Sequence, residues 1–338
     1  MSISLKTHKI LWAPSGGKCA ICKNELVIDP SNLNDDPSIV GDEAHIIARS
    51  ETFTRGDVDS LQPEDRDHYS NLILLCKIHH KQIDDQPAEY TVEKLRNIKA
   101  KHEAEVKQHW TDEDRKKQQD ELIYSGYIDE WARMAQLDDW RAISSYLSDD
   151  TPSLPRTWYN AQKEFIIWII GRIWPHRYPL LESAFQNYKA VLQDLLNVFD
   201  RHVEYDREKG EVIRTKKFYH INEWNPELYE KLSKQYDDHE NLINDLFFEL
   251  TRAANYLCDR VRETIYESYR IVEGAVLIER HSVGFDLKTV HVRLEYRGDE
   301  RVARPYPGLK EFKKVRYTTR DYALSPNDPD IPEADDDA

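Results

Sequence analysis

Four cysteine and histidine side chains have the spacing of a closed metal site. Cys19 and Cys22 are separated by two residues, and Cys76 and His79 repeat that separation farther along the chain. A Cys-x2-Cys spacing brings both thiolates to one ion, and thiolates combined with imidazole are typical of structural zinc. The pattern therefore predicts a structural Zn2+ held by Cys19, Cys22, Cys76 and His79. Its coordination shell is full, so this ion has no place for substrate.

A second pattern lies between and around these ligands. Cys-x2-Cys is followed by Glu-Ala-His-Ile at 43–46, and then by Asn-Leu-Ile-Leu-Leu-Cys-x2-His-His at 71–80. This combination resembles the zinc-containing branch of the HNH endonuclease superfamily, over residues 8–110. The helical pattern EYTVEKLRNIKAKHE is one that commonly closes such domains. The resemblance implies a ββα-metal fold that hydrolyses phosphodiester bonds.

The resemblance also implies roles for three residues. His45 matches the general base that takes a proton from the attacking water, a task for which a neutral imidazole is suited. Asn71 matches the asparagine that holds the ββα loop and orients the base. His80 matches the final histidine, a ligand of a catalytic Mg2+ or Mn2+ ion that stabilises the charge developing on the phosphate. The neighbours His79 and His80 are expected to point in different directions, toward the zinc and toward the cleft.

The sequence departs from the family pattern directly before the base. Many members carry an aspartate or a histidine there that helps to bind the catalytic metal, whereas this chain has Ala44. Another carboxylate or a water molecule has to complete the site. The candidate carboxylates are Glu43, Asp57 and Asp84, and an ordinary solvated surface acid is the alternative for each.

Two arginines follow the base closely in the sequence. Arg49 and Arg55 carry planar guanidinium groups that can grip phosphate oxygens as forked donors. The alternative is that both are loop arginines exposed to solvent.

The chain is long enough for two modest domains, because it has 338 residues and the metal motifs occupy less than a third of them. Residues 1–110 are predicted to form the HNH domain, and the charged residues 111–123 suit a linker or connecting helix. Residues 124–325 are predicted to form a regulatory or oligomerisation domain, followed by a disordered acidic tail at 326–338. The expected fold class is α+β: a small zinc-stapled ββα-metal HNH domain, then a mainly α-helical domain with a C-terminal β-hairpin.

Apolar periodicity supports the helical second domain. Three- and four-residue steps predict one buried helix within 157–174 and another within 178–203. The apolar repeat from Leu242 to Leu257 predicts a very long helix or two consecutive helices, in a bundle or in a paired-helix dimer. Alternation with period two around Gly284 predicts the hairpin.

Capping residues, a proline and the positions of the cysteines give further predictions about the second domain. Asn225 before Pro226 forms a good N-cap and first-turn pair, and Pro175 separates the first two helices. Cys258 stands alone in a helical pattern, where a small core residue is expected. Four cysteines, three of them in the N-terminal block, indicate metal binding and not a disulfide framework.

Charge and hydropathy limit the partners of the protein. The net charge of −15 argues against a protein that coats DNA over its whole surface, so contact with nucleic acid must be local. The sequence lacks an apolar run of membrane-spanning length and the apolar core of a signal peptide. A soluble cytoplasmic protein without a membrane partner is expected.

Three functions are compatible with these patterns. The first is a metal-dependent endonuclease acting on DNA, with RNA as an open alternative substrate, whose helical domain forms a homo-oligomer and responds to a regulatory partner or signal. This organisation resembles effectors of bacterial antiviral defence, by analogy of architecture. The second is a non-catalytic zinc module that binds nucleic acid or protein. The third assigns the main activity to the helical domain.

Overall fold

A computed structural model describes residues 3–30, 37–49, 55, 62, 65–148, 151–204, 210–281 and 289–316. The chain divides into two compact units, Met1–Asp129 and Glu130–Ala338. The division falls inside helix α4 (Asp112–Ala135), so the expected linker residues 111–123 lie with the N-terminal unit. Helices are combined with small antiparallel sheets, which confirms the predicted α+β class.

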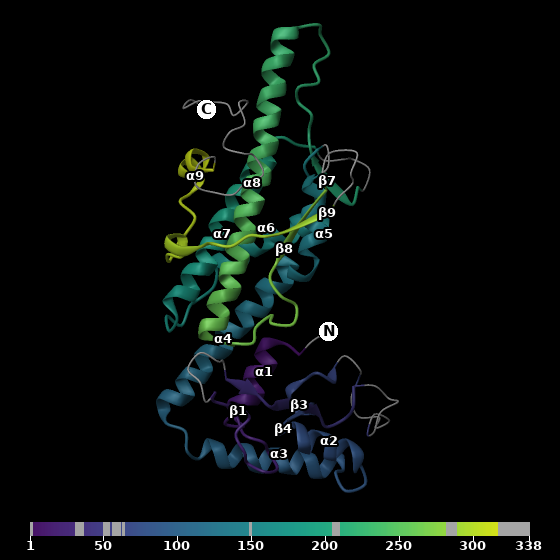
Figure 1. Ribbon diagram of the computed structural model, residues 1–338, viewed down its shortest axis with the longest axis vertical. Coiled ribbons are helices and arrows are strands. Elements are labelled where there is room, and N and C mark those ends of the chain that lie inside the picture. Colours follow the sequence, from purple (N-terminus) through teal and green to yellow (C-terminus); the bar gives the residue numbers. More distant parts are fainter. Residues whose placement is uncertain are drawn as a thin grey trace. The chain divides into compact units, whose positions relative to one another are not determined.

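The N-terminal unit contains short strands and helices around one small core (Figure 1). Its elements before α4 are, in order, α1 (Leu5–Trp12), β1 (Val27–Ile28), β2 (Ser38–Ile39), β3 (Gly41–His45), β4 (Leu72–Cys76), α2 (Lys77–Asp85) and α3 (Val92–Lys107). Strands β3 and β4 pair antiparallel, and α2 follows β4 without a gap. This order is the predicted ββα arrangement.

The register of strands β3 and β4 determines where His45 and Cys76 lie relative to each other. His45 lies opposite Leu72 and Gly41 lies opposite Cys76. All of Leu72–Leu75 is buried, so β4 is a core strand. A Cβ atom at Gly41 would lie 3.0 Å from side-chain atoms of Leu26 and Trp12, so a larger residue there would require these side chains to shift. The glycine therefore lets β3 lie close against the neighbouring loop and α1.

Helix α1 is held at its first turn from two directions. The Ser4 hydroxyl accepts a hydrogen bond from Thr7 N, which is the usual role of a serine N-cap. The Asp129 carboxylate on α4 accepts from the backbone N–H groups of Leu5 and Lys6, both at 2.9 Å. A carboxylate at a helix N-terminus satisfies orphan donors and complements the helix dipole. Helix α4, as far as Asp129, is thereby bound to the start of α1 in this unit.

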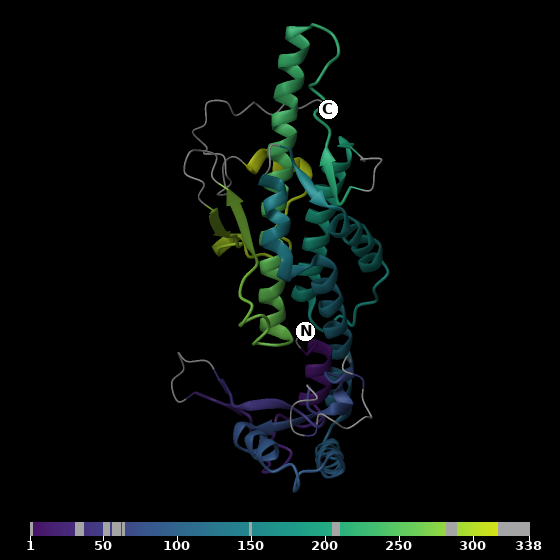
Figure 2. The ribbon, with the colours of Figure 1, turned by 90° about the vertical axis from the view of Figure 1, so that its right-hand side faces the viewer.

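The C-terminal unit is built around two long helices that pack along each other, α7 (Pro179–Asp200) and α8 (Pro226–Thr264) (Figure 2). Its other elements are α5 (Trp140–Ser145), β5 (Ser153–Pro155), α6 (Arg156–Ile170), β6 (Val203–Glu204), β7 (Val212–Thr215), β8 (Leu277–His281), β9 (Thr289–Arg293) and α9 (Leu309–Val315). Among the described helices of both units, none is long and apolar enough to cross a membrane.

Several predictions about this unit are confirmed. Helix α8 is one continuous helix, and the Asn225 side chain caps it by accepting from Leu228 N at 3.1 Å. Strands β8 and β9 pair antiparallel as the predicted hairpin, whose turn lies outside the described residues. Cys258 is buried, and this burial raises its pKa to about 12. The predicted acidic tail at 326–338 also lies outside the described residues.

Other features of this unit were not predicted. Strands β5, β7 and β6 form a three-stranded sheet, and α9 follows the hairpin. The apolar repeat from Leu242 to Leu257 is buried within the unit. Close to it, Trp140 stacks on Phe247 with ring centroids 5.2 Å apart and donates to the Thr251 hydroxyl. The repeat is therefore part of an internal core, as in a bundle.

Candidate active site

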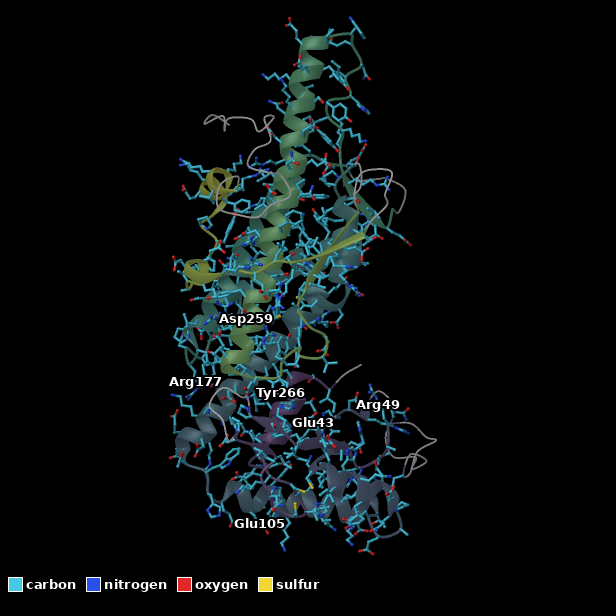
Figure 3. The ribbon with its side chains drawn as sticks, in the orientation of Figure 1. Glu43, Arg49, Glu105, Arg177, Asp259 and Tyr266 are labelled. Atoms are coloured by element: carbon cyan, nitrogen blue, oxygen red, sulfur yellow. The ribbon has the colours of Figure 1, made fainter. Side chains whose placement is uncertain are left out.

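The four predicted zinc ligands come together in the N-terminal unit. The ligand atoms of Cys19, Cys22, Cys76 and His79 all lie within 4.8 Å of one another. His79 Nδ1 is 3.1 Å from Cys76 Sγ and 3.7 Å from Cys19 Sγ. Sulfur at ~2.3 Å and nitrogen at ~2.0 Å from a tetrahedral zinc stand roughly 3.5 Å apart, so this set fits Zn2+. Sulfur atoms are visible in yellow within this unit in Figure 3.

Local structure explains why these ligands meet. Cys76 is the N-cap of α2, and its sulfur accepts from the backbone N–H of His79 one turn later. Across the site, Lys23 follows Cys22 in a left-handed conformation, with φ at 64°. Its ammonium group lies 2.8 Å from Nδ1 of His102 on α3, and the other ring nitrogen of His102 lies 3.0 Å from Ser15 O. Helix α3 thus holds the cysteine turn in place.

His45 ends strand β3 and is partly exposed, with 22% of its side chain accessible. Its Nε2 atom lies 2.9 Å from Oδ1 of Asp67. The other oxygen of Asp67 lies 3.1 Å from Nη2 of Arg49. The predicted base is therefore paired with a carboxylate that comes from a different segment of the chain.

Asn71 is buried and joins the two segments that flank this pair. Its Oδ1 atom accepts from Ile47 N at 2.8 Å, and its Nδ2 atom donates to Ile47 O and Arg66 O, both at 2.9 Å. Ile47 lies two residues after His45, and Arg66 directly precedes Asp67. The Asn71 side chain therefore joins the backbone just after His45 to the backbone just before Asp67.

Helix α3 supports the turn that contains Asn71. The Lys99 ammonium donates to Tyr69 O and Leu72 O, and burial lowers the pKa of Lys99 to about 8. The Tyr69 hydroxyl donates to Glu103, and burial followed by the Glu103 carboxylate raises the pKa of Tyr69. These contacts hold the 3-10 turn Tyr69–Asn71, which directly precedes β4, against α3.

His80 lies on the first part of α2 between two carboxylates. Its Nδ1 atom is 3.0 Å from Oδ2 of Asp42 on β3, and its Nε2 atom is 3.6 Å from Oδ2 of Asp84, one turn later on α2. In a neutral imidazole whose Nδ1–H donates a hydrogen bond to Asp42, Nε2 has the lone pair that can bind a metal ion. Two ligands of one Mg2+ ion, each at ~2.1 Å, are roughly 3–4 Å apart. Nε2 of His80 and Asp84 thus fit one divalent ion.

A comparison with protein families gives the same assignment. Residues 19–86 match the family model HNH_2, described as HNH endonuclease. This part of the chain is an HNH domain. Among curated proteins, the comparison found no match to this chain. The matched residues include the complete Cys3His set and the residues His45, Asn71 and His80.

The remaining candidates of the HNH domain have different surroundings. Asp84 lies beside His80, whereas Asp57 lies outside the described residues. Glu43 faces α1, where it accepts from Trp12 Nε1 at 2.8 Å and contacts His8. Asp42 on β3 contacts His80, and successive side chains of a strand point to opposite faces, so Glu43 is directed away from His80.

Arg55 is not a solvent-exposed phosphate clamp. Its side chain is 5% exposed, and it donates to Ile46 O and to Ile83 O. Its remaining amino group lies 3.0 Å from Asp84 Oδ1. Arg55 thus connects the strand that carries the base to the helix that carries His80. Arg49 is about half exposed and remains near the surface beside Asp67.

Sequence analysis missed Asp42 and Asp67. Asp42 had a signal, because period two in a strand puts it on the same face as Ala44, the position where family members carry a metal-binding residue. For Asp67 the sequence offered no signal, since it belongs to no periodic pattern and reaches His45 through the fold of the loop.

Proposed function

We propose that this protein is a metal-dependent endonuclease that hydrolyses phosphodiester bonds of DNA. The observation that carries the proposal is that the two histidines outside the zinc set are each paired with an aspartate of the HNH domain. His45 is paired with Asp67, and His80 is paired with Asp42. A module that serves as a binding platform needs the zinc ligands alone. Two partly exposed histidines, each oriented by a carboxylate, are what proton transfer and metal binding require.

The proposed step is hydrolysis by an activated water. The water gives one proton to His45, its oxygen forms a bond to phosphorus, and the bond from phosphorus to the leaving oxygen breaks. The leaving oxygen takes a proton from solvent, so the products are one phosphate end and one hydroxyl end. General-base catalysis of this kind contributes about 10²–10⁴ in rate.

His80 and Asp84 are the residues proposed to hold the catalytic ion, Mg2+ or Mn2+. When bound, such an ion stabilises the charge on the reacting phosphate and on the leaving oxygen. Asp42 orients His80 by accepting a hydrogen bond from its Nδ1–H group, and Arg55 positions the Asp84 carboxylate. Imidazole with carboxylate oxygen is a donor set suited to these ions.

The test is cleavage of supercoiled plasmid by purified full-length protein in Mg2+ or Mn2+. His45→Ala is expected to lower cleavage by about 10²–10⁴, with zinc content, melting temperature and DNA affinity unchanged. The matched control is His68→Ala, because His68 is an exposed histidine of the same domain that contacts Ser70. Single-stranded and structured RNA are tested in parallel.

The outcome of this test separates the functional classes. Cleavage by the parent and by His68→Ala, but not by His45→Ala, supports the enzyme. Absence of cleavage in either metal, at all salt concentrations and in all oligomeric states, favours the non-catalytic zinc module. A large loss of stability in His45→Ala identifies His45 as a structural residue.

We further propose that the C-terminal unit regulates the nuclease by self-association and by response to a partner or signal, in the cytoplasm. The net charge of −15 supports this, because a protein that repels DNA except at a local site stays inactive until assembly concentrates its sites. A nuclease attached to a larger helical unit resembles effectors of bacterial antiviral defence. Tight DNA binding that is insensitive to salt and present at all times would contradict this regulation.

A further inference from the structure

Asp67 lies outside every motif of the HNH domain, yet it is in direct contact with the proposed base. We propose that Asp67 is a positioning residue: it holds the His45 imidazole with its proton on Nε2, which leaves Nδ1 to accept the proton of the attacking water. This inference rests on the proposed function, because it assigns the partner of the same base. It adds a residue and a reacting atom to that function.

The direction of the hydrogen bond follows from the chemistry of the two groups. An ionised carboxylate has lone pairs and no proton, so the His45 nitrogen at 2.9 Å from Asp67 must be the donor. A neutral imidazole carries one N–H, so Nδ1 then has the lone pair. Among the described residues, Nδ1 of His45 has no hydrogen-bond partner, which leaves it available for water.

The carboxylate is held before substrate arrives. The residue before it, Arg66, is 3% exposed and donates to Ala48 O at 2.8 Å, while its own carbonyl accepts from Asn71. Asn71 also bonds the backbone of Ile47 in both directions. The backbone just after His45 and the backbone just before Asp67 are therefore joined to each other next to the contact between the two side chains. Such preorganisation is what a base needs to keep its orientation.

Two further features favour a functional role over simple packing. The His45 and Asp67 side chains are 22% and 23% exposed, so water reaches the pair while part of it is shielded. The second oxygen of Asp67 lies 3.1 Å from Nη2 of Arg49, so both oxygens of this carboxylate have partners. An ionised partner on Nε2 stabilises the imidazolium that forms when Nδ1 takes a proton.

The first test measures the tautomer of His45 and needs no cleavage. Full-length zinc-loaded protein with 15N-labelled histidine is examined by long-range 1H–15N NMR at mildly alkaline pH, with the His45 signals assigned from a His45→Gln variant. The expected result is a neutral imidazole protonated on Nε2 in the parent, and a mixture of tautomers in Asp67→Asn. A parent protonated on Nδ1 overturns the proposal, whether or not the variant folds.

The second test measures cleavage kinetics. Asp67→Asn, which keeps the size of the side chain, is expected to lower kcat by about 10- to 100-fold with little change in KM for DNA. The matched control is Asp65→Asn, because Asp65 is an exposed acid of the same turn, and its kcat is expected to equal that of the parent. Equal kcat values for Asp67→Asn and the parent overturn the proposal.

The two tests separate this inference from the proposed function. If the parent cuts no nucleic acid, the endonuclease proposal fails, while the tautomer of His45 still decides whether Asp67 orients the imidazole. If the parent cuts and the tautomer is the same in the parent and in Asp67→Asn, the nuclease stands and the role of Asp67 is refuted.

Discussion

The two motif histidines of the HNH domain are oriented through opposite ring nitrogens. His45 contacts Asp67 through Nε2, whereas His80 contacts Asp42 through Nδ1. In the function proposed above, each carboxylate selects one tautomer of its histidine, so the nitrogen with the lone pair differs between the two rings. The proposal accordingly assigns proton transfer to Nδ1 of His45 and metal binding to Nε2 of His80, near Asp84.

At the residue scale, Asn71→Ala is expected to destabilise the HNH domain without changing the chemistry of the site directly. The substitution removes three hydrogen bonds of the Asn71 side chain, one accepted and two donated, and this side chain belongs to a residue that is only 1% exposed. Buried groups that lose a partner cost about 1–3 kcal/mol each, so a loss of about 2–4 kcal/mol is expected. Urea denaturation and hydrogen exchange at Ile47 N–H measure it.

The control for this prediction is Ser70→Ala, because Ser70 is an exposed neighbour in the same turn. Its free energy of unfolding is expected to equal that of the parent within about 0.5 kcal/mol, the usual range of surface substitutions. The same small change in Asn71→Ala would show that the loop is held by other contacts.

At the element scale, the hairpin, α2 and the cysteine turn are predicted to depend on the zinc ion. Cys19→Ser is expected to lose zinc and to unfold the N-terminal unit, because binding of a structural zinc supplies on the order of 10 kcal/mol that so small a core lacks. Elemental analysis of the purified protein and thermal denaturation with a chelator measure this. One zinc per chain is expected.

Cys258→Ser is the matched control, since Cys258 is a buried cysteine in the other unit. This variant is expected to keep the zinc and the fold of the HNH domain. Freshly purified parent protein without zinc would refute the prediction, as would a Cys19→Ser variant with the parent's melting temperature.

The junction of α7, β7 and α8 is expected to lose stability in acid. His239 is 8% exposed on α8, and its ring lies 4.8 Å from that of His202. Burial, and then the positive charges of His202 and Arg201, lower the pKa of His239 to about 4. The unfolded chain takes up the proton first as pH falls, so folding free energy is lost between pH ~6.5 and ~4, by up to about 3 kcal/mol.

Urea denaturation of the C-terminal unit at a series of pH values measures this loss. His239→Leu is expected to flatten the dependence in that window, because it removes the group whose proton uptake differs between the two states. His220→Gln is the control, since His220 is an exposed histidine of the same region, and it is expected to keep the parent's slope. An unchanged slope in His239→Leu would contradict the assignment.

For the whole molecule, we predict that residues 124–325 self-associate and bring at least two nuclease domains together. One HNH site cuts one strand, so a double-strand break needs two sites. The repeat from Leu242 to Leu257 is buried inside the unit, so another surface is needed. Ile167 and Ile170 on α6 are 75% and 65% exposed, and Ile173 just after this helix is 85% exposed; these apolar side chains suit such a contact.

Light scattering of the full-length protein tests this prediction. The parent is expected to be an oligomer, and Ile170→Glu is expected to shift it to the monomer while zinc content stays the same. Ile78→Glu is the control, since Ile78 is 77% exposed in the HNH domain, and it is expected to remain an oligomer. A parent that is monomeric at all concentrations would refute self-association.

The Cys3His cluster, the HNH assignment and the helical character of the second unit could all be predicted from the sequence. Each of these depends on spacing along one segment: Cys-x2-Cys fits a single ion, and apolar steps of three and four residues mark a helix face. Such patterns remain visible without knowledge of the fold. The cap at Asn225 is equally local, because its side chain bonds a backbone N–H three residues later.

The tertiary structure alone decided the partners of these residues. Asp67 reaches His45 across 22 positions of sequence, and Asp42 reaches His80 across 38. No local spacing encodes these contacts, which exist because the β3–β4 register and the Asn71 bonds bring distant segments together. The burial of Leu242–Leu257 was decided in the same way, since one apolar stripe fits an internal core or a second chain equally well until its neighbours are known.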